Sequence, residues 1–208
     1  LARQAEPEFL DYLLAECLLA VCLRPCPRPL RWRPSPLPSL RYLEMLLTER
    51  CNLRCRHCYL GEAGTAELPL DLVLQALAEL EEMQGLRVLL SGGEPLLYRE
   101  WPALNARLPD YELRFVLLTN GLLLTDEVIR QLKVPEVQLS LDGLQHGHEW
   151  LRGPGTWEKT ASRIPVLREA GLQVSVATMI HRGNLHELPE MRQWLLDQGV
   201  REWNLDLP

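Results

Sequence analysis

Short apolar runs alternate with helical patterns along most of this chain, and this alternation restricts the fold more than any other feature. The runs are rich in leucine or β-branched residues and cover residues 42–48, 86–91, 113–119, 137–142, 172–180 and 200–207. Between the first two runs, leucines recur at helical spacing in residues 70–83. Strands that alternate with helices predict a parallel sheet with helices outside it.

Capping and breaking residues mark further helix boundaries. Thr125 precedes Asp126 and Glu127, as an N-cap followed by an acidic first turn should. A helix is also expected over Thr156–Ala170, and Pro165 inside it should kink or break it.

Two architectures fit this order of elements: an open doubly wound sheet and a curved partial barrel. The runs are too continuously apolar for a sheet with one wet face. In both architectures ligands bind beyond the carboxyl ends of the strands. Polar or glycine-rich motifs follow the first five runs, namely "CNLRCRHCYL", "SGGEP", "TNG", "SLDG" and "TMIHRGN". We therefore expect one functional rim.

Three cysteines in the first motif, Cys51, Cys55 and Cys58, are candidate metal ligands. A closed zinc site or a closed 4Fe–4S cluster needs four protein ligands, and this spacing supplies three. His57 adjoins Cys58, and adjacent side chains rarely converge on one ion. An open metal position is typical of catalytic sites, so the missing fourth cysteine points to a reacting ligand.

The first 40 residues differ from the rest. A short helix is expected at about 8–23, followed by a Pro- and Arg-rich arm. Cys17, Cys22 and Cys26 lie in this part and fit either packed thiols or an auxiliary cluster. We expect two parts, residues 1–40 as an N-terminal helix and arm, and residues 41–208 as the main domain, truncated at its sixth strand.

Charge and hydropathy exclude some classes of partner. The net charge of −6 argues against a protein that coats nucleic acid or anionic lipid. The longest apolar run, Tyr12 to Leu23, is too short to span a bilayer. We expect a cytoplasmic protein without nucleic-acid or membrane partners, where grouped cysteines bind metal more often than they form disulfides.

Together, the cysteine motif after the first strand, "GGEP" after the second and "SLDG…RG" after the fourth resemble the radical S-adenosylmethionine (radical SAM) superfamily. The resemblance covers about Tyr42 to Pro208 and is closest to members with a cysteine-rich C-terminal extension, the SPASM or twitch type. These members include peptide-modifying maturases and enzymes acting on haem precursors. The resemblance implies a partial (β/α)6 TIM-like barrel, which favours the second architecture.

The resemblance also implies a 4Fe–4S cluster on Cys51, Cys55 and Cys58, with S-adenosylmethionine on its open iron. Gly92, Gly93 and Glu94 would meet the methionine ammonium. Ser140 would meet the ribose or carboxylate, and Arg152 the carboxylate. His148 and Glu149 stand where relatives usually have His-Asp. The complete set of implied cofactor-binding residues is His57, Tyr59, Gly92, Gly93, Glu94, Thr119, Asn120, Ser140, Asp142, Arg152 and Met179.

The reaction implied is reductive cleavage of S-adenosylmethionine to a 5′-deoxyadenosyl radical that abstracts hydrogen from a substrate. We expect a peptide or protein substrate, and an electron donor such as a flavodoxin or ferredoxin. A tetrapyrrole or another small molecule is the alternative substrate. A non-catalytic metal-binding scaffold is the alternative from another class, and simple electron transfer would leave "GGEP" without a task. No general acid or base is assigned.

Overall fold

The computed structural model describes residues 40–207. The helix and arm expected in residues 1–40, with Cys17, Cys22 and Cys26, therefore lie outside the described residues, apart from Leu40. Within residues 40–207, no helix is both long and apolar enough to cross a membrane.

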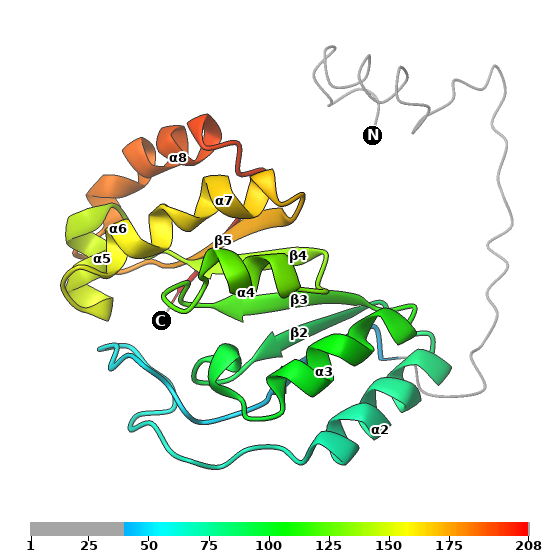
Figure 1. Ribbon diagram of the computed structural model, residues 1–208. Helices are drawn as coiled ribbons and strands as arrows, with labels where there is room; N and C mark the ends of the chain where they lie inside the picture. Colours follow the sequence, from blue (N-terminus) through cyan, green and yellow to red (C-terminus); the bar gives the residue numbers. More distant parts are fainter. Residues whose placement is uncertain (1–39, 208) are drawn as a thin grey trace, which may run out of the picture. The chain divides into compact units, whose positions relative to one another are not determined.

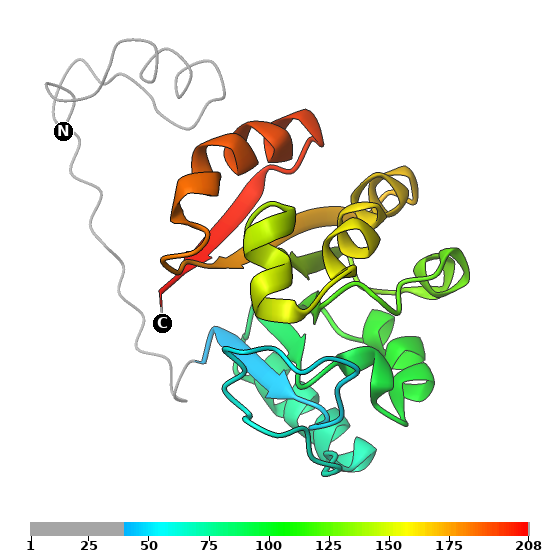
Figure 2. The same ribbon diagram turned by 90° about the vertical axis from the view of Figure 1, so that its left-hand side faces the viewer.

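Six parallel strands pair in sequence order into one curved sheet. They are β1 (Tyr42–Leu46), β2 (Arg87–Ser91), β3 (Arg114–Thr119), β4 (Glu136–Ser140), β5 (Gln173–Met179) and β6 (Glu202–Asp206). The pairing stops at β1 and β6, so the sheet is a partial barrel open between these two edge strands, as Figure 2 shows. The predicted (β/α)6 architecture is confirmed, and the doubly wound alternative is wrong.

The helices lie along the outside of the sheet (Figure 1). The α-helices are α2 (Leu70–Glu82), α3 (Trp101–Arg107), α4 (Asp126–Gln131), α5 (Gln145–Arg152), α6 (Thr156–Ala161), α7 (Arg163–Glu169) and α8 (Leu188–Asp197). Short 3-10 turns occupy Pro95–Leu97, Leu108–Asp110 and Leu185–Glu187. The described residues form one hydrophobic core, in which outward-facing strand residues such as Val88, Leu117 and Leu139 pack under the helices.

Two predicted helix boundaries are confirmed. The Thr125 hydroxyl accepts a hydrogen bond from the Val128 N–H at 3.2 Å, so Thr125 caps α4. The helix expected over 156–170 is broken between α6 and α7, three residues before Pro165. Proline has no N–H to donate to the carbonyl of Ala161 and crowds it, which accounts for the break.

The inner face of the sheet differs from the expectation. Side chains alternate along each strand, and those that face inward include charged and polar groups such as Glu44, Arg87, Glu136 and Gln138. Glu44 is exposed and Gln138 is half-buried, so the prediction of a sheet without a wet face is wrong for the concave side. The mixed composition of this face is possible because the barrel is open and its helices cover only the outer side.

Candidate functional site

A cavity of about 310 Å³ opens at the carboxyl ends of the strands. In Figure 1 the arrowheads of β2 and β3 point to this end, where the loop after β1 and helices α5 and α6 also lie. All three cysteines line the cavity, and so do the predicted residues His57, Tyr59, Gly92, Gly93, Thr119, Asn120, Ser140, Asp142, Arg152 and Met179. The expected functional rim is thus one continuous surface, and Glu94 is the predicted residue that lies outside its wall.

The loop between β1 and α2 carries the three cysteines. Cys51, Cys55 and Cys58 are unpaired and each is partly exposed. Burial raises the pKa of the Cys51 and Cys55 thiols. The side chain of Asn120 donates to Asn52 at 2.8 Å, and Arg56 N–H donates to the Leu151 carbonyl at 2.9 Å. These contacts attach the cysteine loop to the end of β3 and to α5.

The glycines of "SGGEP" allow this segment to lie against the cysteine loop. Gly92 has φ +147°, and a Cβ there would lie 2.5 Å from the Thr48 carbonyl oxygen. A Cβ on Gly93 would lie 2.5 Å from the Arg50 carbonyl oxygen. The N–H of Gly93 donates to the Thr48 carbonyl at 2.7 Å. Any larger side chain would push the cysteine loop away from β2, so both glycines shape the cavity through the protein's own backbone.

Glu94 is fully buried behind the cavity wall. Its carboxylate accepts hydrogen bonds from the Thr119 hydroxyl at 2.8 Å, the Asn120 N–H at 2.9 Å and the Leu96 N–H at 3.3 Å. Burial raises its pKa to about 6, although these hydrogen bonds act in the opposite direction. Glu94 therefore connects the end of β2 to the end of β3.

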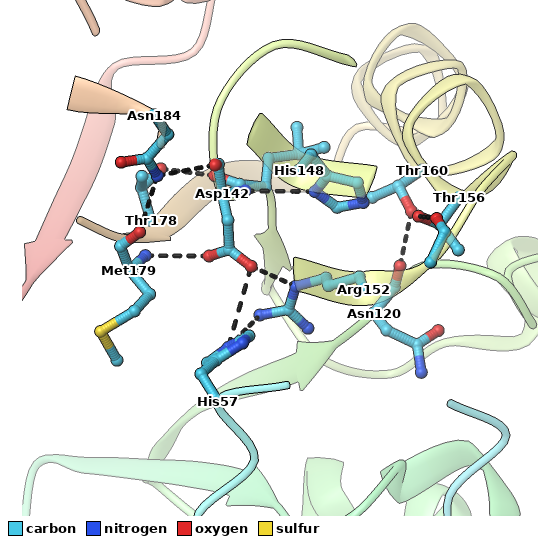
Figure 3. A network of polar contacts seen from close by, with 12 residues as sticks. His57, Asn120, Asp142, His148, Arg152, Thr156, Thr160, Thr178, Met179 and Asn184 are labelled. Carbon is cyan, nitrogen blue, oxygen red and sulfur yellow. Dashed lines mark hydrogen bonds and ion pairs between the residues drawn. The ribbon is translucent and has the colours of Figure 1, made fainter. Parts of the chain in front are cut away.

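The most buried charged pair at the rim is Asp142 with Arg152 (Figure 3). Arg152 Nε donates to Asp142 Oδ2 at 2.5 Å, and the Met179 N–H donates to Asp142 Oδ1 at 2.9 Å. Burial by itself would raise the pKa of Asp142, but the charge and hydrogen bond of Arg152 outweigh it and hold this pKa below its usual range. His57 Nε2 lies 3.8 Å from Asp142 Oδ2 and 3.5 Å from Arg152 Nη2. A guanidinium held in this way presents a fixed positive charge at the cavity wall.

Some residues of the site were not singled out from the sequence. The Thr160 hydroxyl donates to the Asn120 carbonyl at 2.7 Å, and the side chain of Asn184 donates to the carbonyls of Asp142 and Met179 at 2.7 and 2.8 Å. Glu44, Gln138 and Asp206 also line the cavity. The inward alternation of the strands was a usable signal for Gln138, whereas nothing local indicates the contact of Thr160.

Comparison with known proteins identifies the family of this chain. The family model described as the Radical SAM superfamily matches residues 45–195. The chain belongs to the Radical SAM superfamily. The AdoMet-dependent heme synthase of Methanosarcina barkeri is 35% identical over 168 residues, which cover 77% of this chain and 48% of that protein. The PqqA peptide cyclase of Granulibacter bethesdensis is 31% identical over 154 residues, which cover 70% and 41% of the two chains.

The fold is also found in solved structures. Streptococcus suis SuiB, determined with S-adenosylmethionine bound, superposes with a TM-score of 0.72 at 17% identity, over 81% of this chain and 41% of SuiB. The chain spans about half the length of the curated relatives it matches. The superfamily uses a 4Fe–4S cluster and S-adenosylmethionine.

The residues of the cavity fit this pair of cofactors. Among residues 40–207, no three His, Cys, Asp or Glu side chains converge on one ion position. In a 4Fe–4S cluster each thiolate binds a different iron, so the sulfur atoms surround a larger object and do not meet at a point. Three thiols that line one cavity of about 310 Å³ are compatible with such a cluster.

Proposed function

We propose that residues 41–208 carry the S-adenosylmethionine-cleaving site of a radical SAM enzyme. In this proposal Cys51, Cys55 and Cys58 would ligate three irons of a 4Fe–4S cluster, and the fourth iron would be open to the amino and carboxylate groups of S-adenosylmethionine. The observation that supports it most is that three thiols on one loop line the same cavity as Arg152 and Ser140. A fixed guanidinium beside an open cavity suits an anionic group such as the carboxylate of S-adenosylmethionine.

The other cavity residues would bind and orient the nucleotide. Arg152 and Ser140 would meet its carboxylate or ribose, and charge-assisted contacts of this kind are the strong ones. Gly92, Gly93 and Glu94 would form the side of the cavity that faces the amino group, with Glu94 acting from behind the wall.

The remaining contacts would surround the adenosine. His57 and Tyr59 from the cysteine loop, with Met179 at the end of β5, would bound the adenine, and Thr119 and Asn120 would close the adjacent edge. When bound, the cluster supplies the electron that breaks the bond between the sulfonium and the 5′ carbon. The protein residues hold the nucleotide in one pose and exclude water and competing hydrogen donors.

Formation of 5′-deoxyadenosine tests this proposal. After anaerobic reconstitution with iron and sulfide, the protein should convert S-adenosylmethionine to 5′-deoxyadenosine when dithionite is added. Product no higher than that of a Cys58→Ala variant would reject the proposal, and a colourless protein that binds zinc would favour the scaffold.

For the substrate we propose a peptide. The relative that is 31% identical is named a peptide cyclase, and SuiB has also been determined with a precursor peptide, SuiA. The part of the cavity wall without a cofactor role carries Glu44 and Asp206 on the edge strands and Gln138 between them. Two carboxylates and an amide suit peptide N–H groups and basic side chains, and they repel a ligand that is rich in carboxylates.

A haem precursor is the second candidate, because the 35% identical relative is named a heme synthase. The two candidates are separated by measuring how much each compound raises 5′-deoxyadenosine formation above the rate without substrate. Basic peptides should raise it, and an iron porphyrin with several propionates should not. The porphyrin would become the preferred substrate if it raises 5′-deoxyadenosine formation and does so equally in a Glu44→Gln, Asp206→Asn double variant.

The remaining proposals concern the whole protein. We propose an electron donor of the flavodoxin or ferredoxin type, a cytoplasmic location without nucleic-acid partners, and a relationship to the SPASM or twitch branch. Residues 1–40 are proposed to form a separate N-terminal part. A pull-down with reduced flavodoxin and limited proteolysis near residue 40 test the first and last of these.

A further inference from the structure

His148 is a fully buried histidine next to the site, outside the cavity wall. It lies on α5 four residues before Arg152, so the two side chains project from the same face of the helix. Neither the cofactor contacts proposed above nor the packing of the core uses its imidazole nitrogens. The question is what a histidine does there that an apolar residue would not.

Two side chains on one face of α5 hydrogen-bond to Asp142, one to its backbone and one to its carboxylate. His148 Nδ1 accepts the backbone N–H of Asp142 at 3.1 Å, while Arg152 Nε donates to the carboxylate of the same residue (Figure 3). The backbone carbonyl of Asp142 is held by Asn184 at 2.7 Å, and its second carboxylate oxygen by the Met179 N–H at 2.9 Å. Every polar group of Asp142 thus has a partner, and His148 supplies the one for the N–H.

The helix that carries His148 is itself fixed in place. The buried carboxylate of Glu187 accepts the N–H of Leu144 at 2.9 Å and the N–H of Gly147 at 3.0 Å. A Cβ on Gly147 would lie 2.5 Å from Glu187 Oε2, so glycine is needed for this approach. The first turn of α5 is therefore anchored to the segment after β5, and His148 follows directly from it.

Packing alone does not explain a histidine at this position. Because the Asp142 N–H is a donor, Nδ1 must be the acceptor and the hydrogen must be on Nε2. Nε2 has no hydrogen-bond partner among residues 40–207, and a buried unpaired N–H lowers stability. Burial, followed by the charge of Arg152, lowers the pKa of His148 to about 4, so the ring is neutral near pH 7. An apolar side chain would remove the unpaired Nε2–H, but it would leave the buried N–H of Asp142 without its Nδ1 acceptor.

We propose that His148 is a positioning residue whose Nδ1 fixes the backbone of Asp142, so that the Asp142 carboxylate keeps the Arg152 guanidinium at the cavity wall. The effect on ligand binding rests on the proposed function, in which Arg152 meets S-adenosylmethionine. His148 itself lies outside the cavity wall, so we expect it to act through Asp142 and Arg152 and not by contact with a ligand.

Two substitutions separate positioning from packing. His148→Leu removes the acceptor, and His148→Asn keeps an oxygen near the place of Nδ1. In the cluster-reconstituted chain, H148L should raise the Kd for S-adenosylmethionine about tenfold, because the backbone of Asp142 no longer holds the carboxylate that positions Arg152. It should change Tm by no more than about 3 °C, since one buried unpaired N–H replaces another. H148N should restore the Kd to within about threefold of the original protein. The control is His146→Asn, an exposed histidine on the same helix, which should change neither quantity.

The Kd of H148L decides the proposal. Binding by H148L as tight as in the original protein would overturn it, whatever happens to Tm. If H148L binds weakly and also loses stability, H148N decides: recovery of the Kd supports positioning, and equally weak binding overturns it.

A second readout is independent of the cofactors. Nitrogen-15 NMR of the five histidines, with His148 assigned from the signal lost in H148N, should show a neutral ring protonated on Nε2 at pH 6. A ring protonated on Nδ1 would overturn the contact with Asp142. If the unmodified protein fails to bind S-adenosylmethionine while NMR finds the expected tautomer, the proposed function fails and the contact stands.

Discussion

Strand β4 has a buried carboxylate at each of its ends, and the two are used differently. Glu136 opens the strand, and Asp142 follows its last residue, Ser140, by two positions. Both carboxylates are almost inaccessible to solvent, and both are paired with arginine. The amino and carboxyl ends of β4 differ in what surrounds these arginine–carboxylate pairs.

At the amino end of β4, both oxygens of the Glu136 carboxylate accept hydrogen bonds from protein side chains. Glu136 receives hydrogen bonds from Arg87 at 3.0 Å, from Arg114 at 2.8 and 3.2 Å, and from the Ser175 hydroxyl at 2.8 Å. These partners come from β2, β3 and β5, so one carboxylate ties four neighbouring strands together. No ligand is required to satisfy this cluster.

At the carboxyl end, Asp142 holds an arginine that lines a cavity. The difference teaches that burial of an ion pair does not by itself mark a functional site. What marks it is a charged group that the protein fixes in place and leaves facing open space. Four predictions test this distinction, starting with the largest effect.

Loss of a cysteine should abolish the chemistry and leave the fold intact. Cys58→Ala removes one of three proposed cluster ligands, so 5′-deoxyadenosine formation should fall to the level without protein. Because Cys58 is partly exposed, Tm of the cluster-free protein should change by no more than about 2 °C. Arg54→Ala, an exposed change in the same loop, is the control and should retain activity. Activity in Cys58→Ala above background would contradict the role of the thiols.

Asp142→Asn should weaken binding of S-adenosylmethionine. An amide has one acceptor oxygen where the carboxylate has two, so either the Arg152 Nε–H or the Met179 N–H would face an N–H₂ group. The loss of the negative charge also weakens the attraction that holds the guanidinium in place. The Kd, measured by equilibrium dialysis with the reconstituted protein, should rise at least about tenfold, which corresponds to about 1.4 kcal/mol. An unchanged Kd would show that Arg152 does not depend on Asp142.

Glu136→Gln should lower the stability of the fold and leave the affinity for S-adenosylmethionine nearly unchanged. Removing the charge weakens two arginine pairs, although Arg87 keeps an ion pair with Glu202 at 3.7 Å. The free energy of unfolding should fall by about 2–3 kcal/mol, less than for a fully buried pair because Arg87 and Arg114 are partly exposed. Urea denaturation of the cluster-free protein measures this. The Kd for S-adenosylmethionine of the folded, reconstituted variant should stay within about twofold of the original protein, as the amino end has no ligand role. A larger rise in Kd would remove the distinction between the two ends.

Glu94 should make stability depend on pH in a direction unusual for a carboxylate. Because burial raises its folded pKa to about 6, its contribution to stability is complete below the unfolded value near 4.5 and is lost as pH rises through 6. The difference in unfolding free energy between the original protein and Glu94→Gln should therefore change by about 2 kcal/mol from pH 4.5 to pH 7.5. Taking the difference cancels the opposite effect of His148, whose pKa is lowered. A difference that stays constant over this range would contradict the raised pKa.

The sequence predicted the fold well because each strand is a compact apolar run. All six strands lie within two residues of their expected ends, and α2 ends at Glu82 where residue 83 was expected. The polarity of the concave face was missed because inward and outward residues are mixed in each run. In residues 136–140 only the alternation of Glu136, Gln138 and Ser140 reveals that face, and the expected strand began at Val137.

The site was predictable where chemistry lies in a motif and unpredictable where it depends on contacts between distant residues. The cysteines, Gly92 and Arg152 stand in short motifs that meet at one rim because parallel strands end there. The contacts of Asn184 with Asp142 and of Thr160 with Asn120 join residues about 40 positions apart, so no local sequence pattern predicts them. The location of Glu94 behind the wall depends in the same way on β3.

The most direct test of the proposed site is the EPR spectrum of the reduced, reconstituted protein before and after S-adenosylmethionine is added. If Cys51, Cys55 and Cys58 hold a cluster with an iron that no protein side chain ligates, the nucleotide should bind that iron and change the signal of the cluster. A spectrum that S-adenosylmethionine leaves unaltered, at a concentration that saturates binding, would contradict this arrangement.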